Sequence, residues 1–341
     1  MTNDALRPSE SAPQAVMLEL SYGYLRSRAI FVAAELGIAD LLGEGPKNAA
    51  ELAASTGTDA DSLYRLLRML ASHGIFADDG TGKFQLTPLG EVLQSGAPGS
   101  VRDAVRMVDQ QWWNSVGNLL HTVRTGIPAF DAEVGMSFYE YFSKHPEASA
   151  RFDAGLASVS QWENKHIAAA YDFDRFRRIV DVGGSRGGLI AEVLQAHRST
   201  TGVLYDRPEV VAEPTCLRTA GVMERCEVIG GSLLESVPLG ADAYVLKNIL
   251  PDWNDEQSIS ILRLCRDAMA EDGRVLTIDA LVPPGNTEHV SKDLDVILMV
   301  VVRGRERTED EVRELYRNAG LEVTKTVPTR SAYSVVEGKK A

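Results

Sequence analysis

The chain has 341 residues, of which 44% are hydrophobic and 24% are charged. These fractions are ordinary for a globular protein and exclude the disordered, collagen-like and coiled-coil classes. The net charge of −13 disfavours nucleic acid and anionic membranes as partners, and no apolar run reaches the roughly 18 residues that a membrane span needs. The three scattered cysteines and the absence of a signal-peptide pattern predict a cytoplasmic protein.

The sequence predicts four successive segments. Residues 1–14 are polar, contain two prolines and are expected to be flexible. Residues 15–96 show helical periodicity that ends in a hairpin pattern over 75–86, and this order predicts a winged-helix domain, which can bind DNA or pack against a partner chain. Residues 97–170 are predicted to form a helical linker and substrate-pocket region, and 171–341 to form an α/β domain.

The central region is rich in aromatic side chains at helical spacing. Aromatic residues commonly pack in cores and at interfaces, and that interpretation stays open here. The alternative is a pocket wall for a flat, apolar substrate. The candidate substrate residues, with one added from the C-terminal part, are Trp112, Trp113, Phe152, Leu156, Trp162 and Met299.

Short apolar strands alternate with helices beyond Arg177, which is typical of a doubly wound parallel sheet. The last two strands, near 321–324 and 333–336, are joined by a short connection. We expect these two to pair antiparallel, because a parallel return needs a long crossover. The other strands are predicted at 178–183, 202–206, 226–230, 243–246 and 274–278.

A glycine-rich loop, Asp181-Val-Gly-Gly-Ser-Arg-Gly187, follows the first of these strands and opens a helix. Glycines allow a sharp turn and a close approach to a ligand. Asp206 ends the next strand, where a carboxylate can accept hydrogen bonds from ribose hydroxyls. This arrangement predicts an adenosine-type ligand. The position of Asp181 beside the loop, suited to an amino-acid head group, and the antiparallel end of the sheet favour S-adenosylmethionine over a dinucleotide.

The chain resembles a known family, the small-molecule O-methyltransferases of plants and bacteria of the caffeic-acid type. The resemblance implies a Rossmann-like class I methyltransferase domain behind an α-helical winged-helix dimerisation domain, a homodimer, and S-adenosylmethionine or its demethylated product as ligand. The motifs that carry it, in order, are the Asp181 loop, Asp206-Arg-Pro-Glu-Val, Gly230-Gly231, Asp242-Ala-Tyr-Val-Leu-Lys247, Asp252-Trp253 and Gly304-Arg-Glu-Arg-Thr308.

The resemblance also implies the cofactor-binding residues. Ser232 stands where the family usually carries an aspartate that contacts the adenine, and Ser185 replaces a further loop glycine. The hydroxyl of Ser232 can still form a hydrogen bond, but without charge. The expected cofactor-binding residues are Asp181, Gly183, Gly184, Gly187, Asp206, Arg207, Ser232, Leu233 and Lys247.

The reactive motif departs from the family at Pro251. The family carries a histidine there that removes the proton from the substrate hydroxyl, and proline offers no side-chain base. The two acids that orient this histidine in the family correspond to Asp279 and Glu306. Candidate catalytic residues are therefore Asp252, Asp279, Glu306 and, from the central helix, His166.

Two enzyme functions remain open from the sequence. The first is S-adenosylmethionine-dependent methylation, at oxygen, of an aromatic or polycyclic secondary metabolite. The second is a member that binds S-adenosylmethionine but catalyses a hydroxylation or a pericyclic step instead, which the loss of the histidine would favour. A DNA-binding regulator is disfavoured by the acidic charge, and the six histidines are too scattered to predict a metal site.

Overall fold

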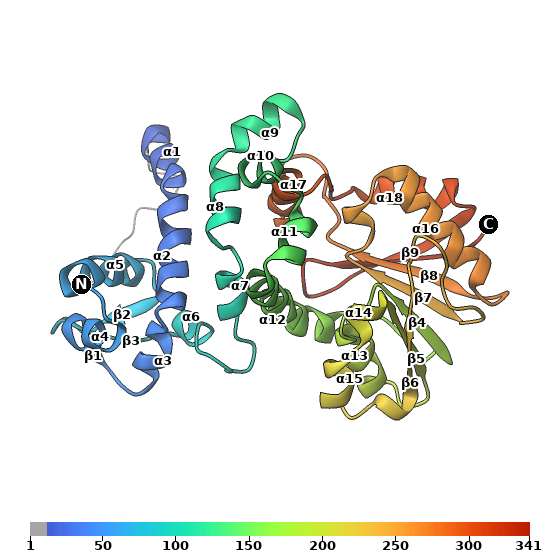
Figure 1. Cartoon of the computed structure of the whole chain (residues 1–341), viewed down its shortest axis with the longest axis horizontal. Helices are drawn as coiled ribbons and strands as arrows, with labels where there is room; N and C mark the ends of the chain where they lie inside the picture. Colours follow the sequence, from blue (N-terminus) through green and yellow to red (C-terminus); the bar gives the residue numbers. More distant parts are fainter. Residues whose placement is uncertain (1–11) are drawn as a thin grey trace. The chain divides into compact units, whose positions relative to one another are not determined.

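The computed structural model describes residues 12–341. Most of the segment expected to be flexible, residues 1–11, lies outside the described residues, and the first helix begins at Pro13 (Figure 1). None of the described helices combines the length and apolar character that a membrane crossing requires.

Two compact units make up the structure. The first contains the residues up to Met107 together with Ala150–Ser158, and the second contains Val108–Ser149 and Val159–Ala341. The region 97–170 is thus divided between the two units. Helix α12 (Pro146–Ala170) is one continuous helix that contributes residues to both.

The first unit holds the predicted helices and hairpin. Strands β2 and β3 pair antiparallel, and β1, which the sequence analysis did not predict, adds to β3. Asn48 begins α4 with a reciprocal capping box, in which its side chain accepts the backbone N–H of Glu51 (2.9 Å). The elements are α1 (Pro13–Ser21), α2 (Gly23–Glu35), α3 (Ile38–Gly43), β1 (Lys47–Asn48), α4 (Ala49–Thr56), α5 (Ala60–Ser72), β2 (Phe76–Asp78), β3 (Lys83–Leu86), α6 (Pro88–Glu91) and α7 (Arg102–Arg106).

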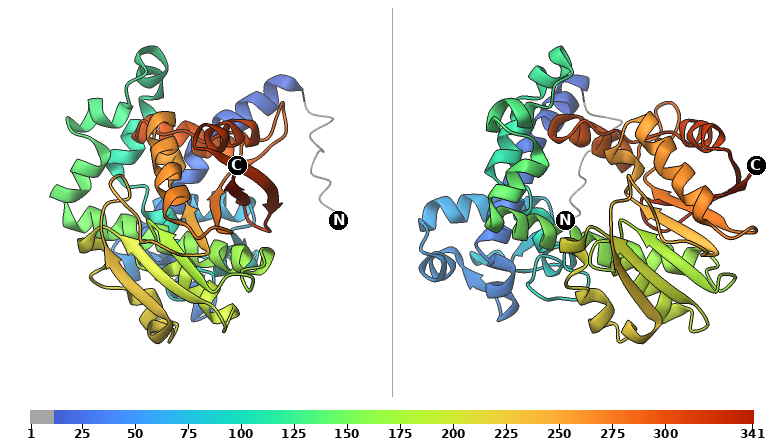
Figure 2. Two further views of the ribbon diagram at one scale, coloured as in Figure 1. Left: turned by 90° about the vertical axis from the view of Figure 1, so that its right-hand side faces the viewer. Right: turned by 45° about the vertical axis from the view of Figure 1, so that its right-hand side comes forward.

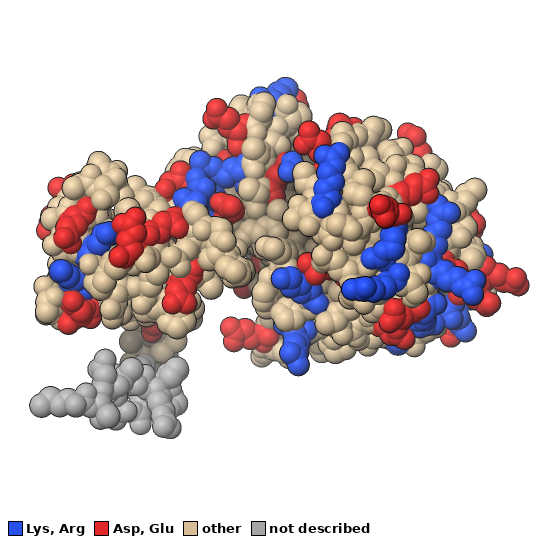
Figure 3. Space-filling view, turned by 90° about the horizontal axis from the view of Figure 1, so that it is seen from below, with Lys and Arg blue, Asp and Glu red and all other residues tan. Residues whose placement is uncertain are grey.

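Charged side chains on this unit are largely acidic on the face drawn in Figure 3, with few basic ones between them. Such a surface repels the phosphate backbone of DNA. The core beneath it is apolar and includes Leu52, Leu67, Leu70, Phe76 and Phe84, each at most 1% exposed. The winged-helix arrangement is therefore built around a complete hydrophobic core.

Helices precede the sheet of the second unit. These are α8 (Gln110–Gly117), α9 (Leu119–Thr125), α10 (Ala129–Val134), α11 (Phe138–Lys144) and the end of α12. Aromatic rings hold three of them together, because Phe138 of α11 meets Trp112 of α8 and Phe130 of α10 edge to face, with ring centroids 5.6 Å and 5.1 Å apart.

A seven-stranded sheet forms the centre of the second unit, in the order β6-β5-β4-β7-β8-β10-β9. Strands β4 to β8 run parallel to one another. Strand β10 is antiparallel to β9, as predicted, and it is also antiparallel to β8. The strands are β4 (Arg178–Val182), β5 (Thr201–Asp206), β6 (Cys226–Gly230), β7 (Ala243–Lys247), β8 (Arg274–Asp279), β9 (Leu321–Pro328) and β10 (Ser334–Lys340).

Both faces of the sheet are covered, because successive strand residues point to opposite sides. Ile179 and the other strand residues that point to the same face pack against α13, α15 and the end of α12. Val180 and the strand residues of the opposite face pack against α16 and α18. Figure 2 shows helices on both sides of the sheet. The remaining elements are α13 (Gly188–Ala196), α14 (Pro208–Val211), α15 (Thr215–Thr219), η1 (Met223–Arg225), η2 (Leu250–Asp252), α16 (Asp255–Ala268), α17 (Val290–Val301) and α18 (Glu309–Asn318).

Glu337, a buried carboxylate on β10, connects this strand to neighbouring elements through hydrogen bonds and ion pairs. It is 3% exposed, accepts hydrogen bonds from Tyr171 and Thr324, and forms ion pairs with Arg175 (3.1 Å) and Lys325 (3.3 Å). Burial by itself would raise the pKa of Glu337, but these hydrogen bonds and cations lower it below its usual value. The charged form of Glu337 therefore stabilises the folded chain.

We predict that Glu337→Gln lowers the free energy of unfolding by about 2–4 kcal/mol at pH 7, because it removes a buried charge that accepts two hydrogen bonds and pairs with cations. The contribution is present above the pKa of an unfolded glutamate, about 4.3, and is lost as the pH falls through the lower folded value. Urea unfolding at pH 7 and pH 3.5 measures both effects. Glu322→Gln, which removes the exposed partner of Lys339 on β9, is the matched control and should cost under about 1 kcal/mol.

Candidate active site

The glycine loop follows β4 at the carboxyl edge of the parallel sheet, where ligands of such folds bind. Gly183 has a φ of +71°, and a Cβ atom there would collide with Ile249, which follows strand β7. Only glycine satisfies both constraints. The absence of a side chain at Gly183 therefore brings the loop after β4 and the segment after β7 into direct contact.

The next loop residues continue the tight turn. Ser185 has a φ of +53° and Gly187 a φ of +85°. A left-handed conformation is costly for serine, and such strain is concentrated at functional sites. Gly187 then begins α13, whose first residues lie beside the loop.

Asp206 sits at the end of β5 and reaches back to the loop. Its Oδ2 accepts the backbone N–H of Ser185 (2.9 Å), and its Oδ1 accepts the backbone N–H of Arg207 (2.7 Å). A carboxylate has about four acceptor positions, so both oxygens can still accept from the two hydroxyls of a ribose. The loop and Asp206 together fit an adenosine-type cofactor.

Asp181 lies beneath the loop rather than on its accessible side. It is 2% exposed, and a Cβ atom on Gly184 would come within 2.7 Å of its carboxyl group. Burial raises the pKa of Asp181 to about 7. Its carboxyl group supports the loop, Oδ2 has no hydrogen-bond partner among the described residues, and the expected contact with an amino-acid head group stays a prediction.

Lys247, at the end of β7, forms a buried ion pair with Glu163 of α12, with 2.8 Å between Nζ and Oε2. The sequence had placed Lys247 beside the cofactor, and the structure adds a partner that the sequence analysis did not predict. Ser232 and Leu233 follow β6 and are half-buried, and Leu233 approaches Gly183. Arg207 is exposed and forms an ion pair with Glu209 (3.3 Å).

The turn that carries Pro251 is held from behind by Arg307. The buried guanidinium group donates to the carbonyl oxygens of Leu250 (2.7 Å) and Trp253 (2.8 Å) and pairs with Asp255 (2.9 Å). Pro251 occupies the start of the short helix η2, where a missing N–H costs nothing. The turn is therefore rigid, and Asp252 is presented at its end.

Three carboxyl groups gather at this turn. Burial raises the pKa of Asp279 to about 7 and, with the negative charges of Asp279, Asp295 and Asp252 nearby, the pKa of Glu306 to about 8. Neither oxygen of Asp279 has a hydrogen-bond partner among the described residues, nor does Glu306 Oε2. Asp252 differs because it is exposed.

Tyr139 of α11 donates a hydrogen bond from Oη to Asp252 Oδ2 (2.8 Å). Desolvation raises the pKa of Asp252, and this hydrogen bond opposes the rise. The sequence analysis counted Tyr139 among the central aromatics but assigned it no role, because nothing local connects it with a residue 113 positions away. No cluster of three or more metal-ligating side chains occurs in the part of the chain that the structure describes.

The candidate substrate residues are divided between the two units. Trp112 is buried against Phe138, which supports the packing interpretation for this residue. Trp113 and Met299 are half-buried in the second unit. Phe152 and Leu156 belong to the first unit.

His166 lies three residues beyond Glu163 on α12 and is half-buried. Trp162 is 48% exposed and packs edge to face on His166, with ring centroids 4.7 Å apart, while the neighbouring Glu163 is 6% exposed. Helical spacing alone leaves Trp162 and Glu163 as alternatives for the inward position, and the structure turns Glu163 inward. No hydrogen bond or ion pair joins His166 to Asp252, Asp279 or Glu306 within residues 12–341.

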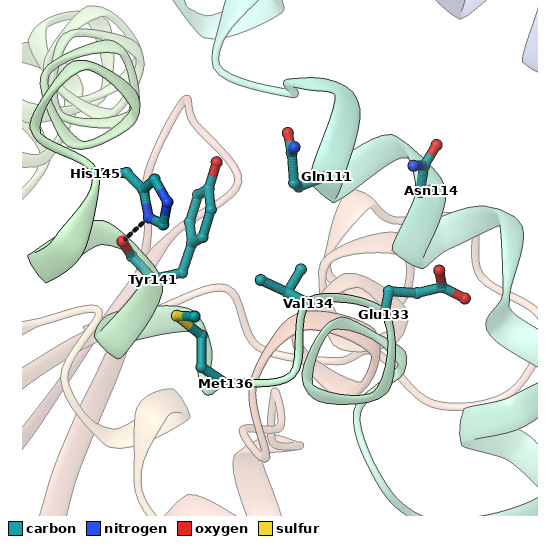
Figure 4. Close-up of a pocket in the computed structure, with 7 residues that line it drawn as sticks. All are labelled: Gln111, Asn114, Glu133, Val134, Met136, Tyr141 and His145. Atoms are coloured by element: carbon teal, nitrogen blue, oxygen red, sulfur yellow. Dashed lines mark hydrogen bonds between the residues drawn. The ribbon is translucent and has the colours of Figure 1, made fainter.

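A separate pocket of about 330 Å³ lies among α8, α10 and α11 (Figure 4). Tyr141 and His145 stack along one side of it, with ring centroids 4.2 Å apart, and the His145 Nδ1–H donates to the Tyr141 carbonyl oxygen (2.8 Å). None of the predicted site residues lines it. The lining residues are Gln111, Asn114, Glu133, Val134, Met136, Tyr141 and His145.

Comparison with known proteins agrees with this architecture. Residues 113–322 match the model of an O-methyltransferase domain, and residues 18–96 match that of an O-methyltransferase dimerisation domain. The dimerisation domain supports a homodimer.

Three similar proteins illustrate the relationship. The chain is 37% identical to phenazine O-methyltransferase PhzM of Lysobacter antibioticus, covering 95% of this chain and 96% of the relative. It is also 37% identical to a 2,7-dihydroxy-5-methyl-1-naphthoate 7-O-methyltransferase of Streptomyces carzinostaticus, covering 91% and 93%. The structure of CalO1, a methyltransferase of calicheamicin biosynthesis in its SAH-bound form, aligns with a TM-score of 0.88 at 39% identity, covering 97% of this chain and all of the other.

These matches extend over both units and include the glycine loop, Asp206 and the acids around Pro251. They favour methyl transfer over the hydroxylation or pericyclic alternative. The chain therefore belongs to the family of S-adenosylmethionine-dependent O-methyltransferases.

Proposed function

We propose that the protein transfers a methyl group to a hydroxyl oxygen of a flat aromatic or polycyclic secondary metabolite, with Asp252 as the base. The observation that carries the proposal is the rigid turn after β7, which presents an exposed aspartate three residues beyond Ile249, the residue that lies against the glycine loop. The substrate class rests on the phenazine and naphthoate named for two relatives. The three cysteines are free thiols, which suits the reducing environment of the cytoplasm.

In this proposal the residues of the glycine loop and Asp206 hold the cofactor. Gly183, Gly184 and Gly187 shape the loop, Asp181 supports it from below, and Asp206 binds the ribose. S-adenosylmethionine, when bound, supplies an electrophilic methyl group on a positively charged sulfur. The remaining expected contacts are Arg207, Ser232, Leu233 and Lys247.

Asp252 is favoured over the other candidates by its accessibility. A base must reach the proton that it removes, and its pKa should lie near the working pH. Asp279 and Glu306 are buried at 4% and 7% exposure, and their raised pKa values keep much of their population protonated at neutral pH. Because they are partly protonated, Asp279 and Glu306 place less negative charge beside Asp252 than two ionised carboxylates would. His166 contributes no proton transfer in this proposal.

Incubation with S-adenosylmethionine and a panel of hydroxylated phenazines and hydroxynaphthoic acids tests the function. Mass spectrometry should find products that gain one methyl group, and NMR should place it on oxygen. If the protein binds the cofactor but methylates no member of the panel, while oxygenated or cyclised products form, the proposed reaction is wrong.

We predict that Asp206→Asn weakens binding of S-adenosylmethionine about ten- to a hundredfold, because hydrogen bonds to a charged group are worth about 1.5–3 kcal/mol. Isothermal titration calorimetry measures the affinity. Asp242→Asn is the matched control, since Asp242 also accepts two backbone N–H groups, from Arg177 (2.8 Å) and Arg178 (3.0 Å), but at the opposite edge of the sheet. Equal losses in both variants would contradict a direct contact with the ribose.

Replacing the base should slow the reaction itself. We expect Asp252→Asn to lower kcat by a factor of about 10²–10⁴, the usual contribution of a positioned base, and to leave cofactor affinity unchanged. The exposed Asp272→Asn, in the loop before β8, is the control and should behave as the wild type. A kcat within twofold of the wild type for Asp252→Asn would refute the assignment.

Asp279→Asn should stabilise the protein in a pH-dependent manner. The folded pKa of Asp279 is about 7, above the value of about 3.9 in an unfolded chain. The folded state thus binds this proton more tightly, and the wild type loses stability as the pH rises from about 4 to 7. Asparagine does not ionise, so the gain in Tm over the wild type should be larger at pH 8 than at pH 5. A gain that is equal at both pH values would contradict the raised pKa.

A further inference from the structure

The hydrogen bond between Tyr139 and Asp252 joins two segments that are far apart in the sequence. Tyr139 lies in α11 and Asp252 at the end of η2, and Oη is 2.8 Å from Oδ2. No other hydrogen bond to either side chain is found within residues 12–341. Both residues are exposed, Tyr139 at 57%. A substrate can therefore reach this pair.

The phenol is held in place by the packing of its helix. Phe138, directly before it, is 4% exposed and contacts Trp112 and Phe130, and Tyr141 packs on Phe130 with ring centroids 5.5 Å apart. Because the neighbours of Tyr139 are locked in an aromatic core, α11 has little freedom to move its exposed tyrosine. The Asp252 side is fixed equally well by the Arg307 contacts.

One oxygen of the Asp252 carboxylate remains available to accept a proton from the substrate. The phenol occupies Oδ2, and no hydrogen bond to Oδ1 is found within residues 12–341. We propose that Tyr139 is a positioning residue, which orients the Asp252 carboxylate so that Oδ1 accepts the proton of the substrate hydroxyl. This inference deepens the proposed function and depends on Asp252 being the base.

The proton transfer balances without any further reagent. The O–H bond of the substrate breaks, and its proton goes to Oδ1 of Asp252. The substrate oxygen keeps the electron pair and uses it to form the bond to the methyl carbon, and the electrons of the broken carbon–sulfur bond remain on sulfur. The phenol of Tyr139 stays protonated throughout, because desolvation and the charge of Asp252 raise its pKa well above the usual value of 10.

Several charged groups act on the pair from the surrounding elements. Asp279 at the end of β8 and Glu306 before α18 are partly protonated at neutral pH, so each adds only a fraction of a negative charge near Asp252, and Arg307 partly compensates that charge. The positive charge of Arg207 acts on Tyr139 and opposes part of the rise in the pKa of its phenol. Against this common background, removal of the phenol oxygen alone should raise the pKa of Asp252, since the hydrogen bond favours the ionised carboxylate.

Carbon-13 NMR of the protein labelled at aspartate carboxyl groups measures the pKa of Asp252 without a substrate. The resonance that disappears in Asp252→Asn identifies the group. We expect Tyr139→Phe to raise its pKa by about one pH unit, as loss of a hydrogen bond to a charged group implies. Tyr141→Phe removes a phenol oxygen from the same helix and should leave the pKa of Asp252 unchanged.

Kinetics with the hydroxynaphthoic acids of the panel complete the test. In Tyr139→Phe the acid limb of the kcat profile should move to higher pH by the same amount, and kcat should fall about tenfold with the KM for the cofactor unchanged. In the Asp252→Asn background the second substitution should have no further effect. An unchanged Asp252 pKa, or an equal effect of Tyr139→Phe in both backgrounds, would overturn the positioning role, whereas wild-type kcat in Asp252→Asn would overturn the base itself.

Discussion

The contact between Gly183 and Ile249 brings the two parts of the site together. Strands β4 and β7 are neighbours, and the chain leaves β4 toward β5 on one side and reaches β7 on the other. At such a reversal of strand order the loops diverge, and a crevice opens at the carboxyl edge of the sheet. Because Gly183 has no side chain, the cofactor loop and the segment leading to Asp252 meet there, and Asp252 lies near enough to Asp279, at the end of β8, for its charge to act on that acid.

Much of the architecture could be predicted from local patterns. The buried strands, the helix over Glu309–Asn318 and the antiparallel last pair follow from hydrophobic periodicity and connection length. The glycine loop and Asp206 were recognisable because their spacing reflects a short, continuous piece of chain. Strand β1 was missed because two residues carry no periodic signal, and α17 was not predicted either.

The missed parts of the site depend on contacts between distant segments. Helical spacing could not decide whether Trp162 or Glu163 points inward, since adjacent residues differ by only 100° around a helix. The ion pair of Glu163 with Lys247 decides it, and this partner lies 84 residues away. In the same way, Arg307 was visible as part of a motif, but its carbonyl partners at Leu250 and Trp253 follow only from tertiary structure.

The turn that carries Pro251 is held by contacts to backbone carbonyl oxygens, so its shape does not depend on the side chain at position 251. The carbonyl oxygen of Pro251 accepts the backbone N–H of Arg305 (2.9 Å), and Arg307 binds the carbonyl oxygens of the first residue of η2 and of the residue that follows the helix. None of these contacts uses the side chain at position 251 or its backbone nitrogen. This turn can therefore accept different residues at position 251 without loss of its backbone path, so the side chains that it displays can change while the fold stays the same.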